Sequence, residues 1–114
     1  MKEDQLNIDE TSLSVDLSEA TEAVKAARFE DALNLLIIVL KDHPDNIDVL
    51  YLAAVSARYL KKFDESKKYI EHLLFNAPDM GRAYQELGHL NRDMGDEEKA
   101  VVHYRQACEL NPAL

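Results

Sequence analysis

The residue types that most often carry catalysis or hold metal ions are scattered along this chain. No two of its four histidines have the i, i+4 spacing that lets one helix present both to a metal ion. The acidic pair Glu97-Glu98 suits a helix start, where carboxylates complement the helix dipole. No Gly-x-x-x-x-Gly-Lys loop is present to cradle a phosphate. We therefore expect solvated histidines, no cofactor, no metal site and no enzyme activity in this chain alone. The four histidines are His43, His72, His89 and His103.

Composition and charge restrict the partners. A formal net charge of −9 argues against nucleic acid, because neutralising phosphates needs a surplus of Lys and Arg. The chain has no apolar run long enough to span a membrane and no cationic, apolar leader, so we expect no membrane span and no secretion. Cys108 is the single cysteine, which fits a reducing cytoplasm. Gly and Pro are scarce and no stretch alternates with period two, so the elements are expected to be helices.

A constant interval organises the chain. The three prolines, Pro44, Pro78 and Pro112, are evenly spaced. Each is expected just after a helix, because proline lacks an N–H and fixes φ. Two sets of small residues keep the same interval and would sit where paired helices cross at close distance. The sets are Ala20, Ala54 and Gly88, and Ala32, Ser66 and Ala100.

The stretch 81–114 carries a recognisable pattern: Tyr84-x-x-Leu87-Gly88-x-x-Asn91, then Ala100-x-x-x-Tyr104, then Pro112. This pattern resembles the tetratricopeptide repeat. The resemblance implies a right-handed all-α solenoid of three helix-turn-helix repeats, about six helices, over 13–46, 47–80 and 81–114. Residues 1–12 are expected to form an acidic tail, since they carry few apolar groups.

The helix boundaries follow from caps and turns. The first helix is expected to begin after a cap at Ser12 or Ser14 and to turn Leu17, Ala20 and Val24 inward. The other helices are expected at about 30–41, 47–60, 64–76, 81–94 and 96–110, with Gly95 in a turn and Asp96 as a cap.

Two apolar surfaces have no evident cover. Ile37 and Ile38 stand where the later repeats have polar residues, so they are expected to be covered by Leu6 and Ile8 of the tail, to form a homodimer contact or to be exposed. The last helix has no successor, so its face is expected to be covered by further repeats of a longer protein or by a second copy. That face carries Val101, Tyr104, Cys108 and Leu110.

In the family that the pattern resembles, the first helices of successive repeats line a concave groove. Carrying these positions over predicts a surface with tyrosines as rigid contact groups and with a net positive charge. Tyr and Arg are favoured at binding hot spots, and Arg binds carboxylates with two hydrogen bonds. The expected ligand is therefore a protein or peptide, of acidic character. The predicted groove residues are Lys25, Tyr51, Val55, Arg58, Tyr59, Arg82, Gln85, His89 and Arg92.

The family's two-carboxylate clamp for chaperone tails corresponds here to Leu17, Thr21, Leu52, Arg82 and Glu86. Only Arg82 has suitable chemistry, so a chaperone-tail adaptor is not expected. The amino-acid sequence of the last repeat, at Arg82 to Leu90 and Leu110 to Leu114, is also similar to the repeat region of bacterial proteins with a downstream sulfotransferase domain. The sequence thus predicts a cytoplasmic protein–protein interaction module. The alternatives are the interaction region of a larger enzyme and a self-associating scaffold.

Overall fold

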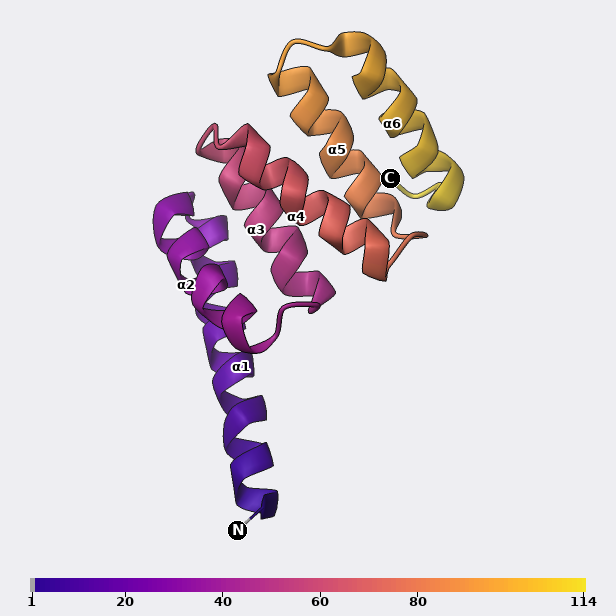
Figure 1. The fold of residues 1–114 in the computed structure, drawn as a ribbon. Helices are drawn as coiled ribbons and strands as arrows, with labels where there is room; N and C mark the ends of the chain where they lie inside the picture. The colour runs from indigo at the N-terminus through magenta and orange to yellow at the C-terminus, as the bar shows by residue number, and fades with distance from the viewer. Residues whose placement is uncertain (1) are drawn as a thin grey trace.

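Six α-helices follow one another in this computed structural model, which describes the backbone of residues 2–114 and the side chains of residue 13 and residues 15–114. Consecutive helices pair as hairpins, α1 with α2, α3 with α4 and α5 with α6, and the hairpins stack in chain order (Figure 1). No strand occurs in residues 2–114. The all-α solenoid predicted from the repeat interval is therefore confirmed. The helices are α1 (Lys2–Lys25), α2 (Phe29–Asp42), α3 (Ile47–Tyr59), α4 (Phe63–Asn76), α5 (Gly81–Asp93) and α6 (Glu97–Leu110).

The start of α1 differs from the sequence-based prediction. The helix begins at Lys2 and runs through Ser12 and Ser14, so the predicted cap is wrong. No glycine or proline interrupts residues 2–25, and nothing else in this stretch stops a helical backbone. The N-terminal half of α1 extends beyond the other helices in Figure 1. The side chains of Leu6 and Ile8 lie outside the described residues, so their contact with α2 stays a prediction.

The turn inside each hairpin uses one backbone position with positive φ. Gly95 has φ +86°, a left-handed conformation that glycine adopts without a steric cost, and Asp96 then accepts a hydrogen bond from the Lys99 amide. Ala27 and Lys61, which hold the equivalent position in the first and second repeats, have φ 59° and 61°. The three turns are therefore alike, although only the last has a residue suited to them.

Small residues lie where the paired helices cross. Ala20, Ala54 and Ala32 have no exposed surface, and Ala100 is 3% exposed. A Cβ atom added to Gly88 would lie 2.5 Å from the ring of Tyr104, so this ring occupies the space that a side chain at 88 would need. The crossing positions inferred from the repeat interval are confirmed.

The hydrophobic core is thickest between the first two hairpins. One cluster of buried residues runs from α1 through α2 into α3, and it includes Ala23, Leu33, Leu36, Val39 and Val49. By contrast, α4 packs less extensively against α5 than α2 does against α3. The junction between the first and second hairpins is thus more apolar and more closely packed than the junction between the second and third.

Candidate functional site

A pocket of about 230 Å³ lies on the side of the stack formed by the first helix of each hairpin. It is lined from α1, α3 and α5 together, so all three repeats contribute to it. Leu17 and Leu52 supply apolar surface, and the guanidinium of Arg82 lies 4.5 Å from the centre of the Tyr51 ring. Such a cation–π contact fixes Arg82 while leaving its N–H groups able to donate. The lining residues are Leu17, Thr21, Asp48, Tyr51, Leu52 and Arg82.

Arg58 is placed differently from its prediction as a groove cation. Its side chain is 6% exposed, and it forms a buried ion pair with Glu86 of α5. Nε donates to Glu86 Oε2 at 2.6 Å, and Nη1 donates to Asp93 Oδ2 at 2.9 Å. The donors of Arg58 are therefore used inside the protein. We call Arg58, Glu86 and Asp93 the ionic clasp, and it joins the second repeat to the third.

The clasp holds its charges in a partly dry environment. Burial alone lowers the pKa of Arg58, but hydrogen bonds and charge from Glu86 and Asp93 outweigh it and raise the pKa above its ordinary value. For Glu86, by contrast, burial raises the pKa, because it disfavours the charged carboxylate. The hydrogen bonds and charge of Arg58 only partly offset this effect. In the folded protein the two side chains are shielded from water and are hydrogen-bonded to each other.

The repeat register contained a signal for this clasp. One repeat before Arg58, Glu86 and Asp93 stand Val24, Leu52 and Tyr59. Two facing apolar positions of the first junction thus become an arginine and a glutamate in the second. Opposite charges appearing together at facing positions indicate a pair, and this comparison between repeats would have revealed Glu86 and Asp93 as its members.

His89 joins the clasp region to the last helix. Its Nδ1 lies 2.7 Å from the Tyr104 hydroxyl, within hydrogen-bond distance. Burial lowers the pKa of His89 below its ordinary value, and the positive charges of Arg58 and Arg92 lower it further. His89 is therefore held neutral more strongly than a histidine in water.

The remaining predicted groove residues are divided between free and occupied positions. Tyr59 stacks on Phe29 with ring centres 4.3 Å apart and carries Arg58 on its ring. Val55 is only 9% exposed, whereas Gln85 is half-buried. Lys25 and Arg92 are exposed, and each lies within 4 Å of an acidic oxygen, Glu22 for Lys25 and Asp93 for Arg92. Tyr51 and Arg82 are thus the predicted groove residues that line the shared pocket, and Lys25, Tyr59 and Arg92 stay exposed outside it.

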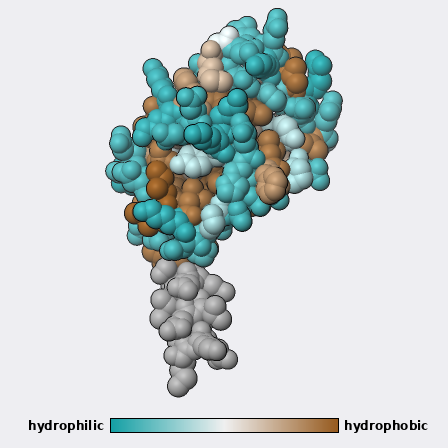
Figure 2. All heavy atoms as spheres, viewed as in Figure 1, coloured by the Kyte–Doolittle hydropathy of each residue, from teal (hydrophilic) through white to brown (hydrophobic). Residues whose placement is uncertain are grey.

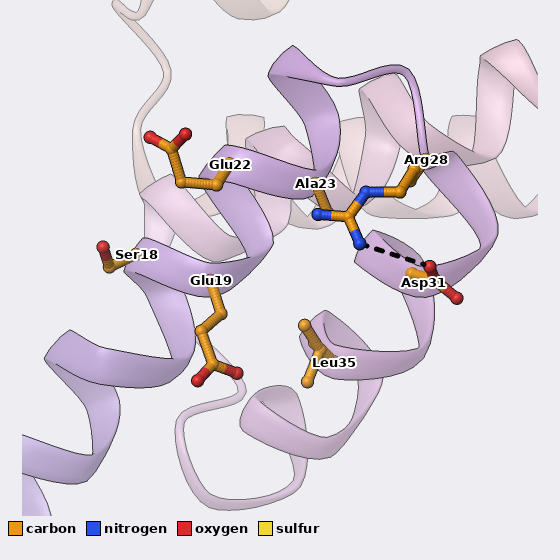
Figure 3. A pocket seen from close by; sticks show the side chains of 7 residues that line it. All are labelled: Ser18, Glu19, Glu22, Ala23, Arg28, Asp31 and Leu35. Atoms are coloured by element: carbon orange, nitrogen blue, oxygen red, sulfur yellow. Dashed lines mark ion pairs between the residues drawn. The ribbon is translucent and has the colours of Figure 1, made fainter.

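A larger hollow of about 340 Å³ lies between α1 and α2 (Figure 3). Ala23 and Leu35 form its apolar part, and the ion pair between Arg28 and Asp31, at 3.8 Å, lies at one side. Only the first hairpin and its turn contribute to it. The other lining residues are Ser18, Glu19 and Glu22.

The residues predicted for self-association are partly exposed. Ile37 and Ile38 are 38% and 57% exposed, and Figure 2 shows apolar surface gathered over α2 on a mostly polar face. Leu110 and Cys108 are also exposed. Tyr104 is different: it is half-buried, with its ring against Gly88 and its hydroxyl 2.7 Å from His89 Nδ1, so only part of it is free for such a contact.

Within residues 2–114, no helix combines the length and the apolar character needed to cross a membrane. The described residues also contain no group of three or more His, Cys, Asp or Glu side chains arranged to hold a metal ion. The absence of enzyme activity in this chain stays a prediction, as does the downstream sulfotransferase domain.

Stacked helical hairpins with a pocket shared by their first helices define the class of helical repeat proteins that bind other proteins. A family model described as tetratricopeptide repeat matches residues 81–114. The last repeat of the chain is therefore similar to this family, and the fold of residues 2–114 agrees with it.

Solved structures share this fold. MamA (MSR-1) is 25% identical, with a TM-score of 0.78 over 89% of this chain and 58% of that chain. The first TPR domain of the human RPAP3 protein is 19% identical, with a TM-score of 0.81 over 90% of this chain and 80% of that chain. The first TPR of Spaghetti (RPAP3), bound to the HSP90 peptide SRMEEVD, is 19% identical, with a TM-score of 0.80 over 90% and 81%. This chain thus spans less than two thirds of the MamA (MSR-1) chain.

Proposed function

We propose that this chain is a protein–protein interaction module that holds a peptide segment of a partner protein against α1, α3 and α5. The observation that carries the proposal is the pocket around Tyr51 and Arg82, because it is built from the first helix of every repeat. The RPAP3 domain bound to an HSP90 peptide supports peptide binding as a use of this fold.

The pocket favours a particular kind of peptide. Leu17 and Leu52 would receive an apolar side chain, and Arg82 would bind a carboxylate next to it. Asp48 lies in the same pocket, so the site is electrically balanced and not strongly cationic. The ligand is therefore a segment with one carboxylate beside an apolar residue. A two-carboxylate clamp does not fit, because Leu17, Thr21 and Leu52 occupy its other positions.

Peptide binding to matched arginine variants tests the proposal. The probe is a fluorescent pool of peptides that each carry one Leu next to one Glu, measured by anisotropy at low salt. Arg82→Ala should weaken binding by about tenfold or more, as expected for a hot-spot arginine. Arg105→Ala on α6 is the control, since Arg105 is exposed and does not line the pocket. Equal affinity of the two variants would rule out the pocket as the site.

Self-association is the second candidate, favoured by the apolar surface at Ile37 and Ile38. Light scattering of the unmodified chain and of Ile38→Lys tests it. A dimer that the substitution dissociates would support this role, and a monomer at all concentrations would exclude it. A cytoplasmic location and a preference for acidic peptides stay predictions.

A further inference from the structure

A second hollow lies where the third repeat meets the second. It has a volume of about 290 Å³, just below the range of roughly 300–1,000 Å³ for ligand pockets. We call it the inter-repeat cleft. Leu87, Leu90, Asn91 and Met94 of α5 and its C-terminal end form its floor. Lys67 and Glu71 of α4 and Lys99 and His103 of α6 form its walls.

The same place at the first junction is filled. One repeat before Lys67, Met94 and His103 stand Leu33, Leu60 and Tyr69. All three belong to or pack against the core cluster that joins the first two hairpins. Tyr69 also packs against the other two core clusters, so its ring occupies the space between repeats. The inter-repeat cleft is therefore open because a lysine and a histidine replace a leucine and a tyrosine.

The first junction indicates which kind of side chain the inter-repeat cleft would accept. An aromatic ring fits between two neighbouring repeats when it is supplied at position 69. In the inter-repeat cleft a ring would meet Leu87, which is half-buried, and the sulfur of Met94, whose side chain is 46% exposed. Thioethers make favourable contacts with aromatic rings. Burial of an aromatic side chain removes about 150–250 Å² from water, which is the largest apolar contribution one residue can make.

The charged residues that line the inter-repeat cleft favour an acidic ligand. Lys67 and Lys99 stand on different walls, and Glu71 is the one acid that lines the cleft among the described residues. Lys99 Nζ lies 3.7 Å from Asp96 and is 71% exposed, so this pair leaves the ammonium accessible. In a chain with a net charge of −9, two lysines around an apolar floor favour a ligand with carboxylates next to its apolar group.

We propose that the inter-repeat cleft binds a partner protein through one aromatic side chain flanked by acidic residues. The ring takes the place that Tyr69 occupies one repeat earlier, and the flanking carboxylates lie between Lys67 and Lys99. This surface is separate from the pocket around Arg82, because the two are lined by different residues. The chain thus offers two independent peptide sites.

The test uses two peptides and four variants of the full chain. The probe is a fluorescent twelve-residue peptide with a single Phe between Glu residues, and its partner peptide carries Ala in place of Phe. His103→Tyr fills the cleft with a ring of the chain's own, as Tyr69 does, and should reduce affinity by about tenfold or more without lowering Tm. Lys67→Glu should weaken binding by a similar factor, and Lys68→Glu, an exposed neighbour that does not line the cleft, should leave it unchanged.

Other outcomes overturn the proposal. Equal binding of the Phe and Ala peptides would show a purely ionic contact, and unchanged binding by His103→Tyr would show that the ring binds elsewhere. Loss of binding in Arg82→Ala alone would assign the peptide to the pocket around Tyr51, which separates this proposal from the proposed function. A dimer in light scattering that His103→Tyr dissociates would make a second copy the occupant.

Discussion

The two junctions between repeats are built from equivalent helices with different chemistry. At the first junction, Leu33, Tyr69 and their neighbours fill the space with apolar groups. At the second, α5 contributes both to the ionic clasp and to the open inter-repeat cleft. The repeat scaffold therefore does not require an apolar junction. It tolerates buried charge when each charge is paired and hydrogen-bonded.

The two junctions also differ in how strictly they fix the orientation of the repeats. An apolar junction can gain contact area in several closely related arrangements, whereas a bidentate arginine–carboxylate pair accepts one geometry. Arg58 bonds Glu86 with both Nε and Nη2, at 2.6 Å and 3.2 Å. The clasp therefore fixes how the third repeat is oriented, in the region where packing between α4 and α5 is weaker.

Removing one member of the clasp should have the largest effect. Arg58→Ala leaves Glu86, which is 2% exposed, without a partner, and an unpaired buried charge costs about 3–5 kcal/mol. Urea unfolding followed by circular dichroism measures the loss. A loss below about 1 kcal/mol would show that the buried pair contributes little, as exposed pairs do.

The double variant Arg58→Val with Glu86→Leu is the control for this prediction. It copies Val24 and Leu52 of the first junction into the second, and apolar replacement of a buried pair is often neutral or stabilising. Most of the stability lost in Arg58→Ala should return. Asp93 keeps access to water, because its side chain is 29% exposed.

Ser56 should give a smaller effect of opposite sign. Its hydroxyl is fully buried in α3, and no hydrogen-bond partner is found for it among the described residues. Ser56→Ala should therefore raise the free energy of unfolding by about 1 kcal/mol, by removing an unsatisfied polar group. The matched control is Ser66→Ala, whose buried hydroxyl donates to the Ala54 carbonyl at 2.8 Å. This control should lose about 1 kcal/mol, and equal signs for the two variants would refute the argument.

His89 should give the smallest effect, a pH dependence. Because its pKa is lowered in the folded state, the folded protein binds the proton less readily than the unfolded chain does. Its contribution to stability is complete above the ordinary value of 6.5 and is lost as the pH falls below it towards the folded-state pKa. Tm should therefore fall by a few degrees more in the native chain than in His89→Gln between pH 7.5 and pH 5.5. Glu86 is present in both proteins, so its own titration largely cancels.

Much of the fold could be predicted because its signals are local. The prolines, Gly95 and Asp96 mark where helices end and begin, and the expected bounds of the last five helices agree with the structure within one residue. The start of α1 could not be found, because residues 2–12 carry neither a stop signal nor a strong apolar stripe. A helical backbone there depends on continuity with the rest of α1.

The candidate site was harder to predict, because side chains choose between partners inside the protein and outside it. Tyr51 and Arg82 line the pocket shared by the first helices, and their role in binding stays a prediction. Arg58 stands at an equivalent type of position, yet Glu86 lies opposite it and captures its guanidinium. Tyr104 was placed on the uncovered face because α6 has no successor, but the missing side chain of Gly88 gives its ring a nearer place.

The contact between Gly88 and Tyr104 implies a rule for how this sequence can drift. The earlier hairpins pair Ala20 with Leu36 and Ala54 with Ile70 at the same two positions, so a methyl group on one helix accompanies a branched aliphatic chain on the other. In the third hairpin, a glycine with no side chain accompanies the larger ring of tyrosine. Sequences descended from a common ancestor with this chain should exchange the two residues together, and glycine replaced by alanine beside an unchanged tyrosine should be rare among them.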